Sequence, residues 1–507
     1  MKQLFIALLI LSSLATQAQQ NKLLEQSFWQ ASPDVTTVKA AIAEGNSPSQ
    51  FNQNSFDPVV LSINAQAPNE TVKYLLTQPG NDITKLTHDG RIYLHWAAYK
   101  GNAELVEYLL SKGSKINFQD SHGTTPMLFA AGAGIQNTKV YDLFIANGAN
   151  LKKDVNQEGA NVLLLSIAND KELTLTNYFI SKGLDLNSTD AAGNNAFSYA
   201  ARSGNIELLK TLVQKGVKPN ANAMLMVAQG GGGRRGAPAV GLPIYQYLES
   251  LNIKPTTTGK GGENALHYIV RKPNQAEVIQ YLLAKGVDVN QVDEDGSTVL
   301  MNAAASNRDT AVFAMIVPKT KNINQVNKKG QTALTLAAGS NSPDVIRYLI
   351  AKGSAVNTVD KSGNNLAYYV VEYNRGQGGP GQGAPGQGAP RADDLDTKLA
   401  ILKENGLNLA APQKNGNTLY HIAVAKNNLA LLKRLEPLGI DVNAKNSEGL
   451  TALHKAAMIA KDDSIMKYLI SIGAKKDVVS NFKETAYDLA SENESLTKSN
   501  VSVNFLK

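Results

Sequence analysis

One short pattern recurs along this chain of 507 residues at intervals of about 33 residues. Its clearest copy reads Gly-Leu-Thr-Ala-Leu-His-Lys-Ala-Ala from Gly449, and a second apolar segment then ends at Gly473. The glycines that open the copies fall at positions 90, 123, 159, 193, 262, 296, 330, 363, 416 and 449. The gap of 69 after Gly193 equals two periods without the middle glycine, and the gap of 53 after Gly363 equals one period plus an insertion. This periodicity predicts one elongated repeat array instead of several globular domains.

Each copy carries the residues that a pair of short helices needs. The Thr451 hydroxyl can accept a hydrogen bond from a free backbone N–H of the first turn. Ala456 and Ala457 allow neighbouring helices to approach closely, and Gly473 can take the left-handed conformation that ends a second helix. Because one helix pair cannot bury its own apolar face, each pair must stack on the next. The sequence therefore predicts an all-α repeat solenoid.

The 33-residue period and the pattern Thr-Pro-Leu-His-x-Ala together resemble the ankyrin repeat family. The segments that carry the first part of the pattern are Thr125–Ala131, Asn264–His267, Thr332–Ala338 and Thr418–Ala423. The second part recurs at Tyr108–Gly113, Tyr281–Gly286 and Tyr348–Gly353. The resemblance spans roughly residues 51 to 490. It implies an ankyrin array of about 12 helix-turn-helix units with short β-hairpin fingers.

The expected domain organisation has five parts. They are a signal peptide (1–18), an N-terminal helical cap (19–50), units 1–6 (51–258, with a Gly-rich insertion at 230–241), units 7–12 (259–480, with a Gly/Pro-rich insertion at 376–390) and a C-terminal capping unit (481–507). The first unit departs from the pattern, since Asp57-Pro58-Val59-Val60 stands where Thr-Pro-Leu-His would.

The beginning of the chain has the pattern of a secretory signal. Lys2 precedes an apolar run from Leu4 to Leu14, and Ala18 supplies a cleavage point. The run is too short to span a bilayer. We therefore expect an exported protein without membrane insertion, located in the periplasm or, alternatively, secreted. The alternative interpretation of this apolar segment is an uncleaved membrane anchor or a buried helix. The absence of cysteine excludes disulfides and favours a bacterial envelope.

The formal net charge of +7 and the pI of about 9.1 have a structural explanation in part. Lysines stand immediately before the glycines that end several second helices, where a cation faces the negative end of the helix dipole. These lysines are Lys112, Lys182, Lys215, Lys285 and Lys352. No dense basic block with interleaved aromatic residues is present, so we expect no nucleic acid partner.

The sequence offers little support for chemistry. His95, His267, His421 and His454 occupy the histidine position of the repeat, where the family resemblance implies a hydrogen bond to the adjacent turn. We therefore expect no metal site, no cofactor and no catalytic residue. No Gly-x-Ser-x-Gly, phosphate loop or paired carboxylates are present, which predicts that the protein is no enzyme.

One acidic stretch has a partial likeness to a calcium loop. It begins at Asp288 and Asn290 and continues to Gly296. A calcium loop needs an oxygen ligand where this stretch has Val292, and a Glu where it has Asn302. The sequence therefore argues against calcium.

A row of aromatic residues could suggest ligand stacking, and core packing is the alternative that we favour. The residues are Trp96, Phe129, Tyr199, Tyr268 and Tyr369. Each occupies a position that the family usually fills with leucine between units.

The ankyrin resemblance implies that partners dock on the concave side, formed by finger tips and the exposed ends of first helices. Carried over by position, the expected protein-binding residues are Arg91, Tyr99, Lys100, Arg202, Arg271, Lys272, Glu372 and Tyr373. Tyr and Arg are enriched at binding hot spots, and the set leans basic, which suggests partners with an acidic surface. The alternative for each residue is an ordinary solvated position.

The expected function is an exported, non-enzymatic scaffold that mediates protein–protein interaction through its concave face with one or more proteins. Two alternatives remain open. One is a secreted effector that binds a host protein, and the other is an accessory or regulatory subunit of an envelope enzyme.

Overall fold

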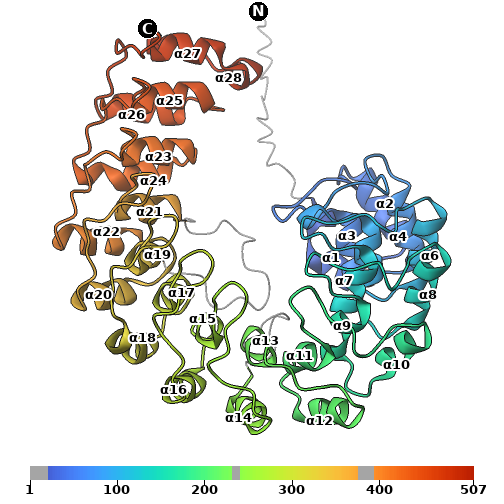
Figure 1. Ribbon diagram of the computed structural model, residues 1–507. Coiled ribbons are helices and arrows are strands. Elements are labelled where there is room, and N and C mark those ends of the chain that lie inside the picture. The colour runs from blue at the N-terminus through green and yellow to red at the C-terminus, as the bar shows by residue number, and fades with distance from the viewer. Residues whose placement is uncertain (1–20, 231–239, 375–392) are drawn as a thin grey trace, which may run out of the picture. The chain divides into compact units, whose positions relative to one another are not determined.

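The computed structural model describes residues 21–230, 240–374 and 393–507 (Figure 1). The expected signal peptide and the insertion at 376–390 lie outside the described residues, as do residues 231–239 of the first insertion. The described residues fall into two compact units, one formed by residues up to 200 with 210–217 and the other by 201–209 with 218–507.

The chain folds into short helices that alternate between a first and a second helix of each repeat. Up to residue 217 the elements are η1 (Lys22–Leu24), α1 (Gln26–Gln30), α2 (Val35–Ala43), α3 (Pro58–Asn64), α4 (Asn69–Leu76), η2 (His88–Gly90), α5 (Tyr93–Tyr99), α6 (Ala103–Ser111), α7 (Pro126–Gly132), α8 (Thr138–Ala146), α9 (Val162–Ser166), η3 (Ile167–Asn169), α10 (Thr174–Ser181), α11 (Ala196–Ala201) and α12 (Ile206–Gln214).

The same alternation continues to the end of the chain. The elements there are α13 (Ala223–Gln229), α14 (Leu242–Ser250), α15 (Ala265–Ile269), α16 (Ala276–Ala284), α17 (Val299–Ser306), α18 (Thr310–Ile316), η4 (Val317–Lys319), α19 (Ala333–Ser340), α20 (Pro343–Ala351), α21 (Leu366–Glu372), α22 (Leu395–Glu404), α23 (Leu419–Ala425), α24 (Leu429–Leu435), η5 (Glu436–Leu438), α25 (Ala452–Ile459), α26 (Ser464–Ser471), α27 (Ala486–Glu492), α28 (Glu494–Lys498) and η6 (Asn504–Leu506).

Successive helices of the same kind stack in two layers. In the second unit, the first helices α17, α19, α21, α23, α25 and α27 pack on one another in chain order, and so do the second helices α18, α20 and α22 (Figure 1). The apolar core lies between the layers, where side chains such as Leu334, Ala337 and Leu349 have no exposed surface. The predicted all-α solenoid is confirmed, and its stability comes from burial between neighbouring repeats.

The predicted helix ends are confirmed in the copy on which the pattern is clearest. The Thr451 hydroxyl accepts from the His454 backbone N–H at 3.4 Å, and the Thr451 N–H donates to His454 Nδ1 at 3.2 Å. This reciprocal pair satisfies two backbone groups at the start of α25. At the other end of the pair, Gly473 has a φ of 101°, which only glycine adopts without strain.

The fingers between repeats are turns, not the expected β-hairpins. Within the described ranges, four of them are closed by isolated antiparallel bridges, at Thr189–Asn195, Thr258–Asn264, Val292–Thr298 and Val359–Asn365. In a typical finger, the Asp293 carboxylate accepts from the backbone N–H groups of Asp295 and Ser297. The Asp295 carbonyl then accepts from Lys328 N in the next finger at 2.8 Å. Side-chain turn chemistry thus replaces a ladder of strands.

Buried asparagines connect consecutive repeats through the backbone. The Asn341 side-chain amide donates to the carbonyls of Ala304 at 2.9 Å and Asn307 at 2.7 Å. Asn307 donates in the same way to Val270 at 2.8 Å. These bonds satisfy carbonyls at the ends of first helices that have no partner within their own helix.

Replacing Asn341 with alanine is therefore expected to lower the free energy of unfolding by about 1–3 kcal/mol, because two buried carbonyls lose their donor. Urea unfolding followed by circular dichroism measures this change. The matched control is Asn405→Ala, since the exposed Asn405 amide donates only within its own helix, to Ile401 at 2.8 Å. Equal destabilisation by the two substitutions would show that the connection between repeats contributes nothing.

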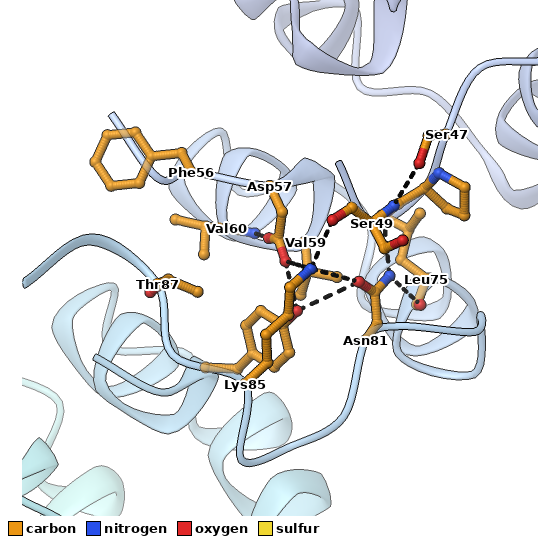
Figure 2. Close-up of polar contacts among 12 residues, drawn as sticks. Ser47, Ser49, Phe56, Asp57, Val59, Val60, Leu75, Asn81, Lys85 and Thr87 are labelled. Carbon is orange, nitrogen blue, oxygen red and sulfur yellow. Dashed lines mark hydrogen bonds and ion pairs between the residues drawn. The ribbon is translucent and has the colours of Figure 1, made fainter. Parts of the chain in front are cut away.

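A buried ion pair replaces the usual capping residues in the first repeat (Figure 2). Asp57 caps α3, where its Oδ1 accepts from Val60 N at 2.9 Å. The other oxygen, Oδ2, lies 2.6 Å from Lys85 Nζ and accepts from the Tyr93 hydroxyl at 2.5 Å. Lys85 also donates to the Ser49 carbonyl at 2.8 Å. A carboxylate at the threonine position thus requires a cation from the following segment.

Candidate protein-binding surface

The expected binding residues lie at finger turns and at the ends of first helices, and their availability differs. Arg91 is held inside its own unit. Its Nε lies 2.9 Å from Asp120 Oδ2 and its Nη1 lies 3.0 Å from Asp89 Oδ2. The guanidinium also lies 4.3 Å from the centre of the Phe129 ring. Arg91 therefore supports the fold between two fingers and has little freedom to bind a partner.

An aromatic cluster surrounds Arg91 at the end of α5. Tyr99 stacks on Phe129 with 5.0 Å between ring centres and 20° between planes, and Trp96 meets Phe129 edge-on at 5.9 Å. Trp96 is buried, as the core interpretation predicts, but Phe129 is half-buried and Tyr99 is 38% exposed. Lys100 lies 5.9 Å from the Tyr99 ring, and burial lowers the pKa of its ammonium group. Tyr99 is the accessible member of this cluster.

Arg202 and Lys272 are brought together in the second unit, and both make internal hydrogen bonds. Arg202 Nη2 donates to Gln229 Oε1 at 3.0 Å. Lys272 Nζ donates to the carbonyls of Ala228, at 2.5 Å, and Gly230. Burial, with a smaller effect from the nearby Arg202, lowers the pKa of Lys272 to about 8. Lys272 binds the backbone and Arg202 binds the Gln229 side chain at the end of α13, so these two cations are not a free basic patch.

Glu372 and Tyr373 lie at the C-terminal end of α21, and their roles differ. Tyr373 is 56% exposed, and its ring lies parallel to that of Tyr369, with 5.9 Å between centres and 1° between planes. Gly339 of α19 lies against this pair, since a Cβ there would meet the Tyr373 ring at 3.4 Å, an ordinary van der Waals contact. The Glu372 carbonyl accepts from Lys426 Nζ. Tyr373 therefore presents an ordered aromatic surface, whereas the Glu372 backbone holds the repeats together.

Arg271 is exposed and lies beside an acidic hollow that sequence reasoning missed. The hollow measures about 230 Å³, and its charged lining consists of Arg271, Glu263, Asp293, Glu294 and Asp295. Two finger turns supply the acids. The outermost of them, Glu263 and Asp295, are more than thirty positions apart along the chain. The available signal was the recurrence of acids in adjacent fingers. Only the second finger, from Asp288 to Gly296, was considered for a ligand, as a calcium loop.

The repeat histidines brace the turns as predicted, with one exception. His95 Nε2 lies 3.0 Å from the Thr124 carbonyl, His421 Nε2 lies 2.9 Å from that of Leu450, and His454 Nε2 lies 3.2 Å from that of Glu484. At His267 the Nε2 atom makes no hydrogen bond of this geometry, although the backbone of Ser297, the equivalent position, still interacts with the imidazole. Burial lowers the pKa of all four imidazoles.

Two negative findings apply to the part of the chain that the structure describes. No cluster of three or more histidine, aspartate or glutamate side chains there is arranged to hold a metal ion. None of the helices there has both the length and the apolar character that crossing a membrane requires.

Stacked helix pairs, capping threonines and Asp/Asn finger turns define a helical repeat protein, a class that uses its surface for recognition. The family of ankyrin repeats (3 copies) matches residues 61–154, 135–223, 242–325, 300–377 and 394–501. These matches cover most of the chain. The protein belongs to the ankyrin repeat family.

Several proteins from distant organisms are similar to parts of this chain. A palmitoyltransferase, AKR1 of Lachancea kluyveri, is 28% identical over 236 residues, which are 45% of this chain and 26% of that protein. An ankyrin repeat protein of Fowlpox virus is 33% identical over 127 residues, 25% of this chain and 22% of its own. Protein phosphatase 1 regulatory subunit 12A of Mus musculus is 37% identical over 79 residues, 16% of this chain and 8% of its own. The chain thus spans about a quarter of the first two relatives.

The comparison with the palmitoyltransferase corrects the expectation that this protein is no enzyme. AKR1 is an enzyme by name, and it shares sequence with almost half of this chain. The prediction was wrong because it rested on missing motifs. A repeat array can be part of an enzyme whose catalytic motifs lie elsewhere. Missing catalytic motifs within the array are therefore no evidence against an enzyme.

Proposed function

We propose that this protein is a scaffold that binds another protein through the side of its array formed by finger turns and the ends of first helices, the expected concave side. The observation that carries this proposal is the pair of exposed, ordered tyrosines. Tyr99 and Tyr373 each stack on a neighbouring ring, so that little side-chain entropy is lost when a partner covers them. Tyrosine is among the residues that most often dominate binding energy.

Basic charge contributes less to this proposal than the sequence suggested. Arg91, Arg202 and Lys272 make ion pairs or hydrogen bonds within their own units. The expected acidic partner therefore has weaker support than a partner that packs against aromatic rings.

Tyr99→Ala and Tyr373→Ala are each expected to reduce partner recovery at least fivefold in a pull-down from the native source, because truncating a hot-spot side chain costs more than about 1 kcal/mol. Quantitative mass spectrometry of the recovered proteins measures the loss. The matched control is Tyr348→Ala, on the second helix α20. Undiminished recovery with both variants would remove the finger side as the binding surface.

A second candidate is a regulatory subunit that binds an enzyme. The similarity to protein phosphatase 1 regulatory subunit 12A favours it. An enzyme activity that co-purifies with the wild-type protein, and is lost with Tyr373→Ala, would distinguish this role from that of a passive scaffold.

We also propose that the protein is exported, to the periplasm or beyond the cell as a secreted effector. The support is the apolar run from Leu4 to Leu14 after Lys2. N-terminal sequencing of the mature protein, together with fractionation of periplasm and culture medium, tests this. A chain that retains Met1 in the cytoplasmic fraction would contradict it.

A further inference from the structure

Three consecutive fingers of the second unit carry exposed lysines at their tips. The fingers precede α19, α21 and α23, and the lysines are Lys328, Lys329, Lys361 and Lys414. None of these four ammonium groups forms an ion pair within residues 21–230, 240–374 and 393–507. They differ in this respect from Arg91, which two carboxylates hold. These fingers therefore present free positive charge.

The backbone fixes the spacing of these tips. Lys361 N donates to the Lys329 carbonyl at 2.9 Å, and Lys414 N donates to the Gly363 carbonyl at 3.1 Å. The lysine stems lie against the glycine of the preceding finger. A Cβ at Gly330 would come within 3.2 Å of Lys361 Cγ, and a Cβ at Gly363 would come within 2.8 Å of Lys414 Cδ. The lysines thus form one continuous row, called here the lysine row.

Exposed valines are a second and independent feature of this row. Val326 is 53% exposed and Val359 is 59% exposed. Each stands two positions before a lysine of the row, and both occupy the same position of adjacent fingers. The apolar groups are therefore one repeat apart, as the lysines are. Exposed apolar side chains bordered by polar groups are typical of a surface that binds another molecule.

Acidic fingers bound the lysine row on both sides. The finger before it carries the exposed Glu294 and Asp295, and the finger after it carries the exposed Glu448. Backbone hydrogen bonds join both to the row, since Lys328 N donates to the Asp295 carbonyl at 2.8 Å and Ser447 N to the Asn415 carbonyl at 2.9 Å. A wide anionic surface such as a membrane would also meet these carboxylates and be repelled. Charge complementarity therefore favours a short anionic segment that spans three fingers.

We propose that the lysine row binds an acidic segment of a partner protein in the polyproline II conformation, with aliphatic side chains on Val326 and Val359. Neighbouring helices of a stack lie about 8–10 Å apart. A polyproline II chain repeats every three residues, over about 9.3 Å. A carboxylate at every third residue therefore meets one finger after another. The inference deepens the proposed function and rests on it for the existence of a protein partner.

A fluorescent peptide in which Glu-Pro-Val is repeated three times provides the probe, and its anisotropy reports binding to the full chain. The affinity is expected to fall about tenfold in Lys328→Gln/Lys361→Gln/Lys414→Gln, because three partly screened ion pairs are lost. Val326→Ser/Val359→Ser should weaken binding about threefold through the lost apolar contact. A peptide of the same composition with its glutamates adjacent should bind more weakly, since its carboxylates cannot reach three fingers.

The matched control is Lys319→Gln/Lys403→Gln/Lys475→Gln, which removes three exposed lysines on or just after second helices of the same unit. Equal affinity loss in the two triple variants would overturn the proposal, since the peptide would then respond only to net charge. Equal affinity for the two peptides would also overturn it, because the spacing of the carboxylates would not matter. Binding of phosphatidylglycerol vesicles through the lysine row, without binding of the peptide, would overturn it in favour of a membrane surface.

Partner recovery distinguishes this inference from the proposed function. Recovery that depends on Tyr99 and Tyr373 but not on the lysine row would leave the proposed function standing and refute the acidic segment alone. Recovery that depends on the lysine row but not on the two tyrosines would support the acidic segment and remove the tyrosines as the main contact.

Discussion

Replacing Lys85 with methionine is expected to lower the free energy of unfolding of the N-terminal repeats by about 3–5 kcal/mol. Asp57 is fully buried, and Lys85 is the only cation within 4 Å of its carboxylate among the described residues. Methionine keeps the length of the side chain but leaves the carboxylate without a counter-charge. Urea unfolding followed by tryptophan fluorescence measures this loss locally, because the two tryptophans of the chain, Trp29 and Trp96, both lie in this unit.

The double variant Asp57→Thr/Lys85→Met supplies the control. Threonine is the residue that caps other repeats, as Thr451 does at α25, and it needs no cation. The double variant is therefore expected to recover most of the stability that Lys85→Met loses. If Lys85→Met alone costs less than about 1 kcal/mol, the pair behaves as an exposed salt bridge and the argument from burial fails.

Acidification is expected to destabilise the protein well before most carboxylates titrate, with His95 as the largest single contributor. Burial lowers the pKa of His95 to about 4 in the folded state, whereas the unfolded value is about 6.5. The unfolded chain therefore binds more protons between these values, and stability that is complete above pH 6.5 is lost as the pH falls toward 4. Linkage gives a loss of about 2 kcal/mol at pH 5 and about 3 kcal/mol at pH 4.

The measurement is the free energy of unfolding in urea at several pH values between 7 and 5. His95→Gln removes the titrating group, so its stability should depend less steeply on pH than that of the wild type, even though the variant is less stable at pH 7. His267, His421 and His454 shift in the same direction and add to the slope of both proteins. Parallel curves for wild type and His95→Gln would contradict the assignment.

The fold was largely predictable because its rules are local. A capping threonine, small residues along the first helix and a glycine after the second specify each helix pair, and 33-residue repetition requires that pairs stack. Fingers were predicted less well. Their asparagine and aspartate side chains satisfy the backbone in place of strands, as Asp293 does, and a period alone does not distinguish the two solutions.

The sequence predicted where the candidate binding residues lie, but not which of their side chains are free to contact a partner. Sequence placed Arg91 and Tyr99 on the same side of the array, and nothing in the pattern separated them. The structure separates them, because Arg91 meets acids of its own and the next finger while Tyr99 stacks on Phe129 and remains 38% exposed. Contacts of this kind join residues about 30 positions apart, and the repeat pattern does not predict which side chains of adjacent repeats meet.

The sequence by itself determined the helical repeat, the family and the positions that vary between copies, because these depend on propensities and spacings within about one period. Only the tertiary structure decided which charges are free. Lys85 meets Asp57, and Arg91 meets Asp120, because stacking brings adjacent repeats within hydrogen-bonding distance. Charge compensation between repeats depends on how far a side chain reaches and on how deeply it is buried. Neither can be predicted from the residues of a single repeat.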